Sequence, residues 1–312
     1  MRPRIVCVVG PTASGKTGFA LELAARIDAE ILSADSRQIY RGLDIGTAKP
    51  TVIERAHIRH HGFDLVEPDQ YFDAARYRTM ARAAIADAHR RHKPIIVAGG
   101  TGLYIRVLLH DLCPAPPRAP ALRAVLVRWA AAQGPPALHR RLALVDAPAA
   151  ARIHVNDAMR IVRALEVALL SGRRLSDWQR DHAFAPGPFE ALLVGLAVPP
   201  VTLDARIAAR VDGMLARGWL TEVRTLHARG HADDAPVWRT LGYAQMRAVV
   251  EGRCTLAAAR DATVLATRRY AKRQRTWFRR EPGVVWHDVE RERGAVLDIA
   301  TAFLHAPRIA KG

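Results

Sequence analysis

Residues 4–17, RIVCVVGPTASGKT, decide the fold of this chain. The run from Ile5 to Gly10 is apolar and ends in glycine, which is typical of a buried parallel strand. A helical pattern follows over 16–27, with Phe19, Leu23 and Ile27 on one face. A loop of this kind between a buried strand and a helix points backbone N–H groups and the positive helix end at an anion. The stretch therefore predicts an α/β core that binds phosphate.

The loop itself matches the eight-residue P-loop pattern. Lys16 is expected to neutralise phosphate charge, and the hydroxyl of Thr17 is expected to bind Mg²⁺. The pattern indicates a ligand that contains pyrophosphate, but it does not select ATP. Its eight residues are Gly10, Pro11, Thr12, Ala13, Ser14, Gly15, Lys16 and Thr17.

No Walker B carboxylate accompanies this P-loop. The apolar strand predicted over 95–98 is followed by Gly-Gly-Thr, whereas the run over 30–34 is followed by Asp35. From the residues alone, Asp35 has two interpretations. It is either a magnesium ligand or a base that faces whatever the P-loop holds.

The order of predicted elements indicates an α/β fold with an insertion. Strand and helix alternate through the helix over 73–92 and the strand over 95–98, and this alternation favours a parallel sheet flanked by helices. After the proline-rich stretch 113–120 the pattern is helical over 121–181, and strand character returns over 189–198. Further helices are expected over 203–217, 240–251 and 256–279, then a strand near 284–287 and a terminal helix. We predict a P-loop core over 1–115 and 189–312, with an all-helical domain inserted over 116–188.

Composition suggests a polyanionic partner. The 312 residues carry a formal net charge of +17, and basic side chains displace the counterions condensed on phosphates. Arginine outnumbers lysine, so biased codon usage is an alternative explanation. The longest apolar runs are only strand-sized, and the first strand leaves no room for a signal peptide. Three scattered cysteines form neither a disulfide framework nor a zinc pattern. We expect a reduced, cytoplasmic protein that does not enter a membrane.

Several blocks besides the P-loop resemble one family. They are SADSRQIYRGLDIGTAKP at 33–50, GGTGLY at 99–104, ARIH at 151–154 with Asn156-Asp157, Gly242-Tyr243, and KRQ at 272–274 with Trp277. In collinear order from about residue 4 to 290, they resemble the tRNA dimethylallyltransferases, also called tRNA isopentenyltransferases. The resemblance implies transfer of a dimethylallyl group from dimethylallyl pyrophosphate to the exocyclic amine of the adenosine 3′-adjacent to the tRNA anticodon.

The resemblance also assigns catalytic roles. Asp35 matches the family's catalytic base, and Thr101 matches a threonine near the reacting carbon and the bridging oxygen. Arg210 matches an arginine that contacts pyrophosphate, beside Lys16, Thr17 and Mg²⁺. Without the resemblance, a strand-end or N-cap threonine is the better interpretation of Thr101, and a solvated helix face is the better one for Arg210.

The expected partner is the tRNA anticodon stem-loop, gripped by the helical insertion, with the protein acting as a monomer. RNA sequence is read mainly in single-stranded loops, where a base can be splayed out. The family's tRNA contacts map onto Asp35, Ser36, Arg37, Gln38, Thr101, Arg123, Met159, Arg160, Ile161, Val162, Arg163, Arg239, Thr240, Leu241, Gly242, Tyr243 and Ala244.

The most basic segment, 268–280, lacks acidic residues and has interleaved aromatic residues, which suits phosphate contact with base stacking. The alternative is an amphipathic helix that packs Tyr270, Trp277 and Phe278 inward while its arginines face solvent. RNA contact is predicted for Lys272, Arg273, Gln274, Arg275, Thr276, Trp277, Phe278 and Arg279.

Three other functions compete with this one. An adenylate isopentenyltransferase would share the P-loop and the acidic base but would need neither the helical insertion nor the basic segment. A small-molecule kinase would use ATP at the P-loop. An RNA-binding ATPase would keep its turnover without Asp35.

Overall fold

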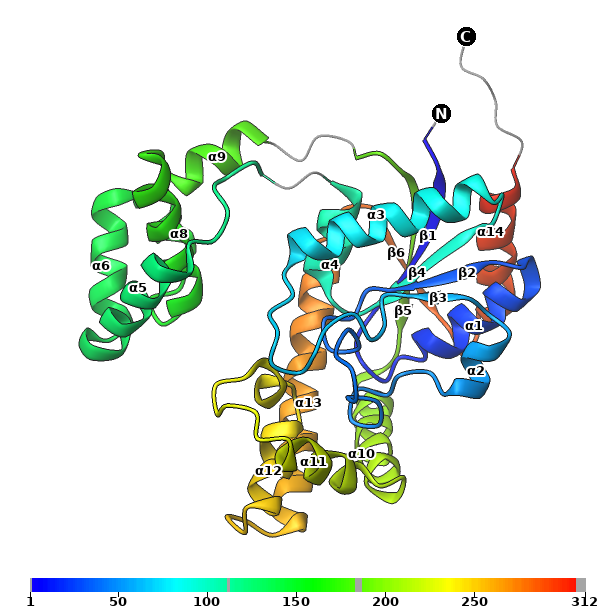
Figure 1. Ribbon diagram of the computed structural model, residues 1–312. Helices are drawn as coiled ribbons and strands as arrows, with labels where there is room; N and C mark the ends of the chain where they lie inside the picture. Colours follow the sequence, from blue (N-terminus) through cyan, green and yellow to red (C-terminus); the bar gives the residue numbers. More distant parts are fainter. Residues whose placement is uncertain (1, 111–112, 183–186, 307–312) are drawn as a thin grey trace. The chain divides into compact units, whose positions relative to one another are not determined.

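Six parallel strands form one sheet in the order β3-β2-β4-β1-β5-β6 (Figure 1). The computed structural model describes residues 2–110, 113–182 and 187–306. The parallel sheet flanked by helices confirms the predicted α/β class. The strands are β1 (Arg4–Val9), β2 (Glu30–Ser33), β3 (His60–His61), β4 (Ile95–Gly99), β5 (Glu190–Ala197) and β6 (Val284–Asp288).

The register of the sheet brings three loops to one edge. Val9 at the end of β1 lies opposite Gly99 of β4 on one side and Gly195 of β5 on the other. Ser33 at the end of β2 lies opposite Ala98. Because parallel strands point the same way, the loops that follow β1, β2 and β4 must meet at their carboxyl ends. These are the P-loop, the loop with Asp35 and the loop with Thr101.

Helices cover both faces of the sheet. On one face, α1 (Lys16–Ile27) and α14 (Arg293–His305) pack in one hydrophobic cluster with Val6 and Val8. On the other, α3 (Ala74–Arg90) contacts β2, β4 and α4 (Gly102–Leu109), and Tyr77 stacks on Tyr104 with 3.9 Å between ring centroids. The bounds of α1 are those the sequence predicted, and those of α3 lie within two residues of the prediction.

A second hydrophobic core lies beyond the sheet and includes Trp219 and Tyr243. It joins the loop over 39–48 to four helices, because both bury their apolar side chains in the same cluster. The short elements α2, β3, α4 and α11 were not predicted, since too few residues carry their periodicity. The elements around this core are α10 (Pro200–Ala216), α11 (Trp219–Ala228), the 3₁₀ helix Pro236–Arg239, α12 (Tyr243–Val250) and α13 (Leu256–Arg279); the short helix α2 (Val52–Ala56) has no buried residue.

The chain divides into two units by its internal contacts: a core unit of residues 1–109 and 188–312, and a helical unit of residues 110–187. The connecting residues 111–112 and 183–186 lie outside the described residues. None of the described helices is long and apolar enough to span a membrane. The helical unit contains α5 (Pro120–Gln133), α6 (Pro135–Val145), α7 (Ala147–Arg152), α8 (Ala158–Ser171) and α9 (Leu175–His182).

A buried lysine fastens the loop that carries Asp35. The side chain of Lys49 is 1% exposed, and its Nζ donates to Asp44 Oδ1 at 2.8 Å, to Asp64 Oδ1 at 2.6 Å and to the Tyr40 carbonyl at 2.5 Å. The ammonium group therefore ties three points of the 40–64 segment together. It offsets its own desolvation through these charge-assisted bonds.

Replacing Lys49 by methionine should lower the free energy of unfolding by about 1–3 kcal/mol, because the buried Tyr40 carbonyl loses its donor and Asp44 and Asp64 lose their charged partner. Lys93→Met is the matched control: its ion pair with Asp28 is exposed, and such pairs contribute roughly 0–1 kcal/mol. Chemical denaturation of both variants checks this. Equal losses would contradict the role given to Lys49.

Candidate active site

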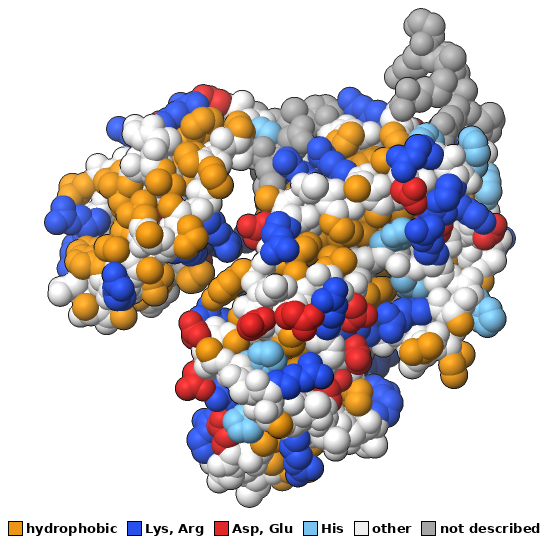
Figure 2. Space-filling model, in the orientation of Figure 1, with side chains coloured by type: hydrophobic (Ala, Val, Ile, Leu, Met, Phe, Trp, Pro, Cys, Tyr) orange, Lys and Arg blue, Asp and Glu red, His pale blue; other side chains and the backbone are white. Residues whose placement is uncertain are grey.

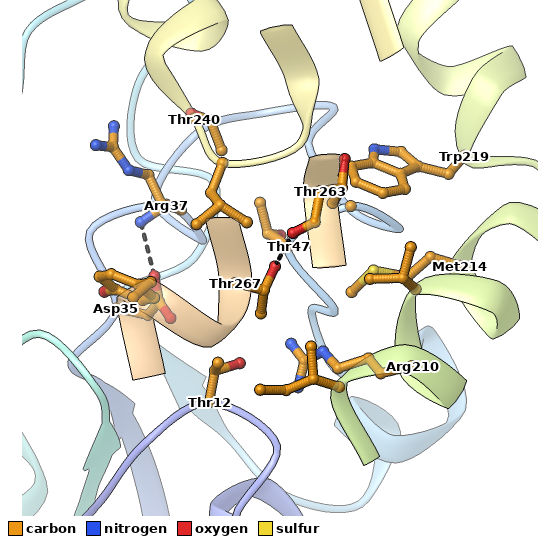
Figure 3. A pocket seen from close by; sticks show the side chains of 15 residues that line it. Thr12, Asp35, Arg37, Thr47, Arg210, Met214, Trp219, Thr240, Thr263 and Thr267 are labelled. Carbon is orange, nitrogen blue, oxygen red and sulfur yellow. Dashed lines mark hydrogen bonds between the residues drawn. The ribbon is translucent and has the colours of Figure 1, made fainter. Parts of the chain in front are cut away.

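Two adjoining cavities lie at the carboxyl edge of the sheet. We call the first the polar cavity; it is lined by Thr12, Lys16, Thr17, Asp35, Gln38, Ala98, Gly99, Gly100, Arg210, Tyr270 and Gln274. We call the second the apolar cavity (Figure 3); it is lined by Thr12, Asp35, Arg37, Gly46, Thr47, Ile207, Arg210, Val211, Met214, Trp219, Thr240, Leu241, Thr263, Thr267 and Tyr270. Because four residues line both, the cavities meet at Thr12, Asp35, Arg210 and Tyr270.

The P-loop turns sharply at two glycines. Gly10 has φ +147°, and a Cβ there would lie 3.1 Å from the Leu196 carbonyl oxygen. Gly15 is the N-cap of α1 with φ +88°, a conformation that glycine adopts without strain. The loop thus ends at the N-terminus of a 12-residue helix, where unpaired N–H groups attract anions.

Lys16 is held in an electrostatically unfavourable position. Its Nζ donates to the Pro11 carbonyl at 2.6 Å, within the P-loop. The pKa of Lys16 is lowered to about 7, first by burial and then by the positive charge of Arg210, while Asp35 opposes both effects. Burial likewise lowers the pKa of Arg210, with Asp35 again opposing. Two crowded cations of this kind would be stabilised by a bound polyanion.

The loops of Asp35 and Thr101 are tied to each other. Asp35 Oδ1 accepts the Arg37 backbone N–H at 2.8 Å, the bond drawn in Figure 3. Thr101 Oγ1 accepts the Ser36 backbone N–H at 3.0 Å, and the Thr101 N–H donates to the Ala34 carbonyl at 3.0 Å. Thr101 directly precedes α4, where an N-cap residue lies, and its hydroxyl also binds the neighbouring loop.

Gln274 of α13 joins the P-loop to the loop of Thr101. Its Oε1 accepts the Thr12 N–H at 2.8 Å, and its Nε2 donates to the Gly100 carbonyl at 2.9 Å. A Cβ on Gly100 would lie 2.1 Å from Nε2, so only glycine permits this approach. Gln274 is 5% exposed and both ends of its amide are occupied by backbone groups. This geometry supports a bridging role inside the site in place of the predicted RNA contact.

Tyr270 belongs to the site although the sequence indicated only that it packs inward. Burial raises the pKa of its hydroxyl to about 12, and Asp35 adds to the shift. The hydroxyl therefore stays protonated near neutral pH. A signal was present in the sequence: Thr263, Thr267, Tyr270 and Gln274 are spaced by four, three and four residues, which puts them on one face of a helix.

The other residues predicted to contact RNA include both buried and exposed side chains. The buried side chains cannot contact RNA in this conformation, whereas the exposed ones can. Phe278 and Tyr243 are fully buried in the core unit, and Ile161 and Val162 in the helical unit. Exposed members are Met159, Arg160, Arg239, Ala244, Lys272, Arg273, Thr276 and Arg279.

Two arginines of the helical unit are engaged within it. The carboxylate of Glu166, which is fully buried, accepts Arg163 Nη1 at 2.9 Å, Arg123 Nη1 at 3.2 Å and the Ala119 N–H at 3.0 Å. The face of this unit drawn in Figure 2 otherwise mixes arginines with hydrophobic side chains, and Leu169 is one of the exposed hydrophobic residues of the unit. The arginines of this surface suit contact with phosphates.

Comparison with known proteins decides the family. A family model described as "IPP transferase" matches residues 38–281. The tRNA dimethylallyltransferase of Anaeromyxobacter sp. (strain K) is 52% identical over 292 residues, which are 92% of this chain and 95% of that protein. The chain belongs to the IPP transferase family.

Solved structures of similar proteins agree with this family. The full-length tRNA isopentenylpyrophosphate transferase of Bacillus halodurans is 34% identical with a TM-score of 0.72, and the match covers 97% of each chain. A eukaryotic dimethylallyltransferase acting on tRNA is 25% identical with a TM-score of 0.84, covering 99% of this chain and 81% of that one. The resemblance seen in the sequence is thereby confirmed.

The site of this IPP transferase family member has oxygen ligands suited to Mg²⁺. Mg²⁺ in phosphate-binding sites usually takes one or two protein oxygens, phosphate oxygens and water. The Thr17 hydroxyl belongs to a residue that lines the polar cavity. This donor fits a magnesium ion that binds together with a diphosphate and takes its remaining ligands from phosphate oxygens and water.

The lowered pKa of Lys16 makes anion binding depend on pH. Below about pH 7 the ammonium is charged in the free protein, and above it the amine is neutral. A bound diphosphate favours the charged form, so above pH 7 binding takes up a proton and affinity falls as pH rises, by up to about tenfold per pH unit. Calorimetric titration with inorganic pyrophosphate from pH 6 to 9 measures this slope.

Lys16→Arg is the matched control, because an arginine keeps its charge throughout this pH range. The pH dependence of pyrophosphate affinity in this variant therefore does not include titration of residue 16. Wild type should lose affinity relative to this variant above pH 7. Parallel curves for the two proteins would show that Lys16 stays charged in the free site.

Proposed function

We propose that the chain transfers a dimethylallyl group from dimethylallyl pyrophosphate to the exocyclic amine of the adenosine 3′-adjacent to the anticodon of tRNA. The observation that carries this proposal is the meeting of a P-loop cavity and an apolar cavity beside Asp35. A ligand with a diphosphate at one end and a short hydrocarbon at the other matches this pair of cavities. Membership of the IPP transferase family supports the reaction class.

The exocyclic amine of adenine is a poor nucleophile, because its lone pair is delocalised into the ring. As the nitrogen bonds to the first carbon of the allylic group, the carbon–oxygen bond to pyrophosphate breaks and its electron pair goes to the bridging oxygen. The amine becomes acidic only during this step. In the proposed mechanism the Asp35 carboxylate accepts its proton, an effect worth about 10²–10⁴-fold. The nearby Thr101 hydroxyl acts at the reacting carbon and bridging oxygen.

Cations and the N-terminus of helix α1 stabilise the negative charge that develops on the departing pyrophosphate. Lys16 and Arg210 flank the polar cavity, and each is destabilised there without an anion. Fixed donors directed at developing charge stabilise a transition state, typically by about 3–4 kcal/mol for each donor. Bound at Thr17 with the diphosphate, Mg²⁺ would neutralise part of the phosphate charge.

The nucleic-acid substrate of the proposed reaction is the tRNA anticodon stem-loop. The exposed basic residues of α13 and of the helical unit support phosphate contacts with it. The protein is proposed to act as a monomer. The reaction is expected in the cytoplasm, where tRNA is available.

Incubation with tRNA and labelled dimethylallyl pyrophosphate, followed by nucleoside analysis, tests this function. The proposal expects a prenylated adenosine from the anticodon loop and no consumption of ATP. Prenylation of free AMP in preference to tRNA would favour an adenylate isopentenyltransferase. Phosphate transfer from ATP would favour a kinase or an ATPase.

Asp35→Asn should bind both substrates and lose about 10²–10⁴-fold in kcat, because the amide keeps the bond from the Arg37 N–H but cannot accept a proton. Single-turnover kinetics with saturating substrates measure the loss. Asp73→Asn is the control: Asp73 caps α3, asparagine caps a helix equally well, and the residue lines neither cavity. An unchanged kcat in Asp35→Asn would remove the residue as the base.

Replacing Arg279 and Arg280 by alanine should weaken tRNA binding and reduce the slope of log affinity against log salt by up to about two, because each arginine would neutralise one phosphate. Both residues are exposed near the end of α13. Affinity for dimethylallyl pyrophosphate should stay the same. Arg2→Ala serves as the control, since Arg2 precedes β1 at the amino edge of the sheet. Unaltered tRNA affinity in the double variant would exclude this end of α13 from the RNA surface.

A further inference from the structure

The apolar cavity has one wall made by a stripe of α10. Ile207, Val211 and Met214 follow one another at intervals of four and three residues, so they share a face of the helix, and all three are buried. Arg210 lies beside this stripe, where the apolar cavity meets the polar one. The wall therefore changes from charged at the junction to hydrocarbon farther in.

The opposite wall is built from threonines whose hydroxyls are already bonded. Thr263 Oγ1 donates to the Ala259 carbonyl at 2.8 Å, and Thr267 Oγ1 donates to the Thr263 carbonyl at 2.7 Å, both within α13. Thr47 donates in the same way to the Leu43 carbonyl at 2.5 Å. A hydroxyl that donates to the carbonyl four residues earlier has no proton left to donate to a ligand. With the threonine methyl groups and the aliphatic stripe, the wall of this cavity is mostly hydrocarbon.

The far end of the cavity is rigid around Trp219 and adjustable at Met214. A Cβ on Gly46 would lie 2.0 Å from Trp219 Nε1, and a Cβ on Gly242 would lie 2.2 Å from its Cη2, so two backbone segments hold the indole in place. Met214 is unbranched and 4% exposed, and of the three residues of the stripe it is nearest in sequence to Trp219. Figure 3 draws Met214 and Trp219 on the same side of the cavity, away from Asp35.

Resting on the proposed function, we infer that the apolar cavity holds the prenyl chain of the donor and that Met214 limits this chain to five carbons. The cavity measures about 80 Å³. One water-sized group needs about 10–15 Å³, so the space is of the order that a short hydrocarbon chain fills. With the diphosphate in the polar cavity, the first carbon lies at the junction beside Asp35, and the two methyl groups point toward Met214.

The test compares dimethylallyl pyrophosphate with geranyl pyrophosphate, a ten-carbon donor, in the wild type and in Met214→Ala. Wild type should prefer the shorter donor strongly. Met214→Ala should raise kcat/KM for geranyl pyrophosphate relative to dimethylallyl pyrophosphate by about 10–200-fold, the range that small changes of fit in a hydrophobic pocket produce. Mass spectrometry of the tRNA nucleosides identifies which chain was transferred.

Met246→Ala is the matched control, because Met246 is a fully buried methionine of the same core that does not line the cavity. It should lose stability and keep the wild-type ratio of the two donors. If Met214→Ala does not fold, Met214→Val supplies a smaller enlargement, with a smaller gain expected.

The outcomes separate the two proposals. Absence of dimethylallyl transfer to tRNA by the wild type would overturn the proposed function itself. Normal transfer by the wild type, with no gain of geranyl transfer in folded Met214 variants, would overturn only the role of Met214. A raised KM for tRNA with an unaltered donor ratio would assign the apolar cavity to the adenine ring instead.

Discussion

The alignment of the strand ends is the constraint on which the site depends. Three loops with no sequence proximity meet because β1, β2 and β4 are neighbours in one parallel sheet and end at the same level. Hydrogen bonds then fix their spacing: the Thr101 hydroxyl binds the Ser36 N–H, and Gln274 spans from Thr12 to Gly100. Each loop is therefore positioned by the others as well as by its strand. A change in Gln274 would act on the P-loop and on Thr101 together.

Charge and hydrocarbon are separated on the two sides of this junction. In the polar cavity, burial and mutual repulsion destabilise the charged forms of Lys16 and Arg210, so an anion is the group that the site lacks. In the apolar cavity, threonine hydroxyls are bonded to their own helix and leave methyl groups facing the space. An allylic diphosphate satisfies both halves at once, and its reactive carbon then lies beside the one carboxylate that both cavities share, Asp35.

Much of this site could be predicted from sequence, because its parts are local. The sequence after the P-loop predicts both bounds of α1 correctly. Asp35 and Thr101 follow apolar runs that form strands and end at the carboxyl edge of the sheet. What could not be predicted depends on contacts between distant residues. Gln274 lies in a basic segment that indicated RNA, but its amide bonds to backbone groups 262 and 174 residues away. Arg123 similarly gave no sign that Glu166, 43 residues away, binds it. The direction of a threonine hydroxyl is also invisible in a sequence.

The most direct test of the central claim is a crystal structure of the protein with an anticodon stem-loop and a non-cleavable analogue of dimethylallyl pyrophosphate. The account predicts the diphosphate against Lys16 and the P-loop, and the adenine exocyclic nitrogen about 2.6–3.2 Å from the Asp35 carboxylate, the distance that proton transfer requires. A complex in which Asp35 points away from that nitrogen, or in which the diphosphate lies outside the P-loop, would contradict it.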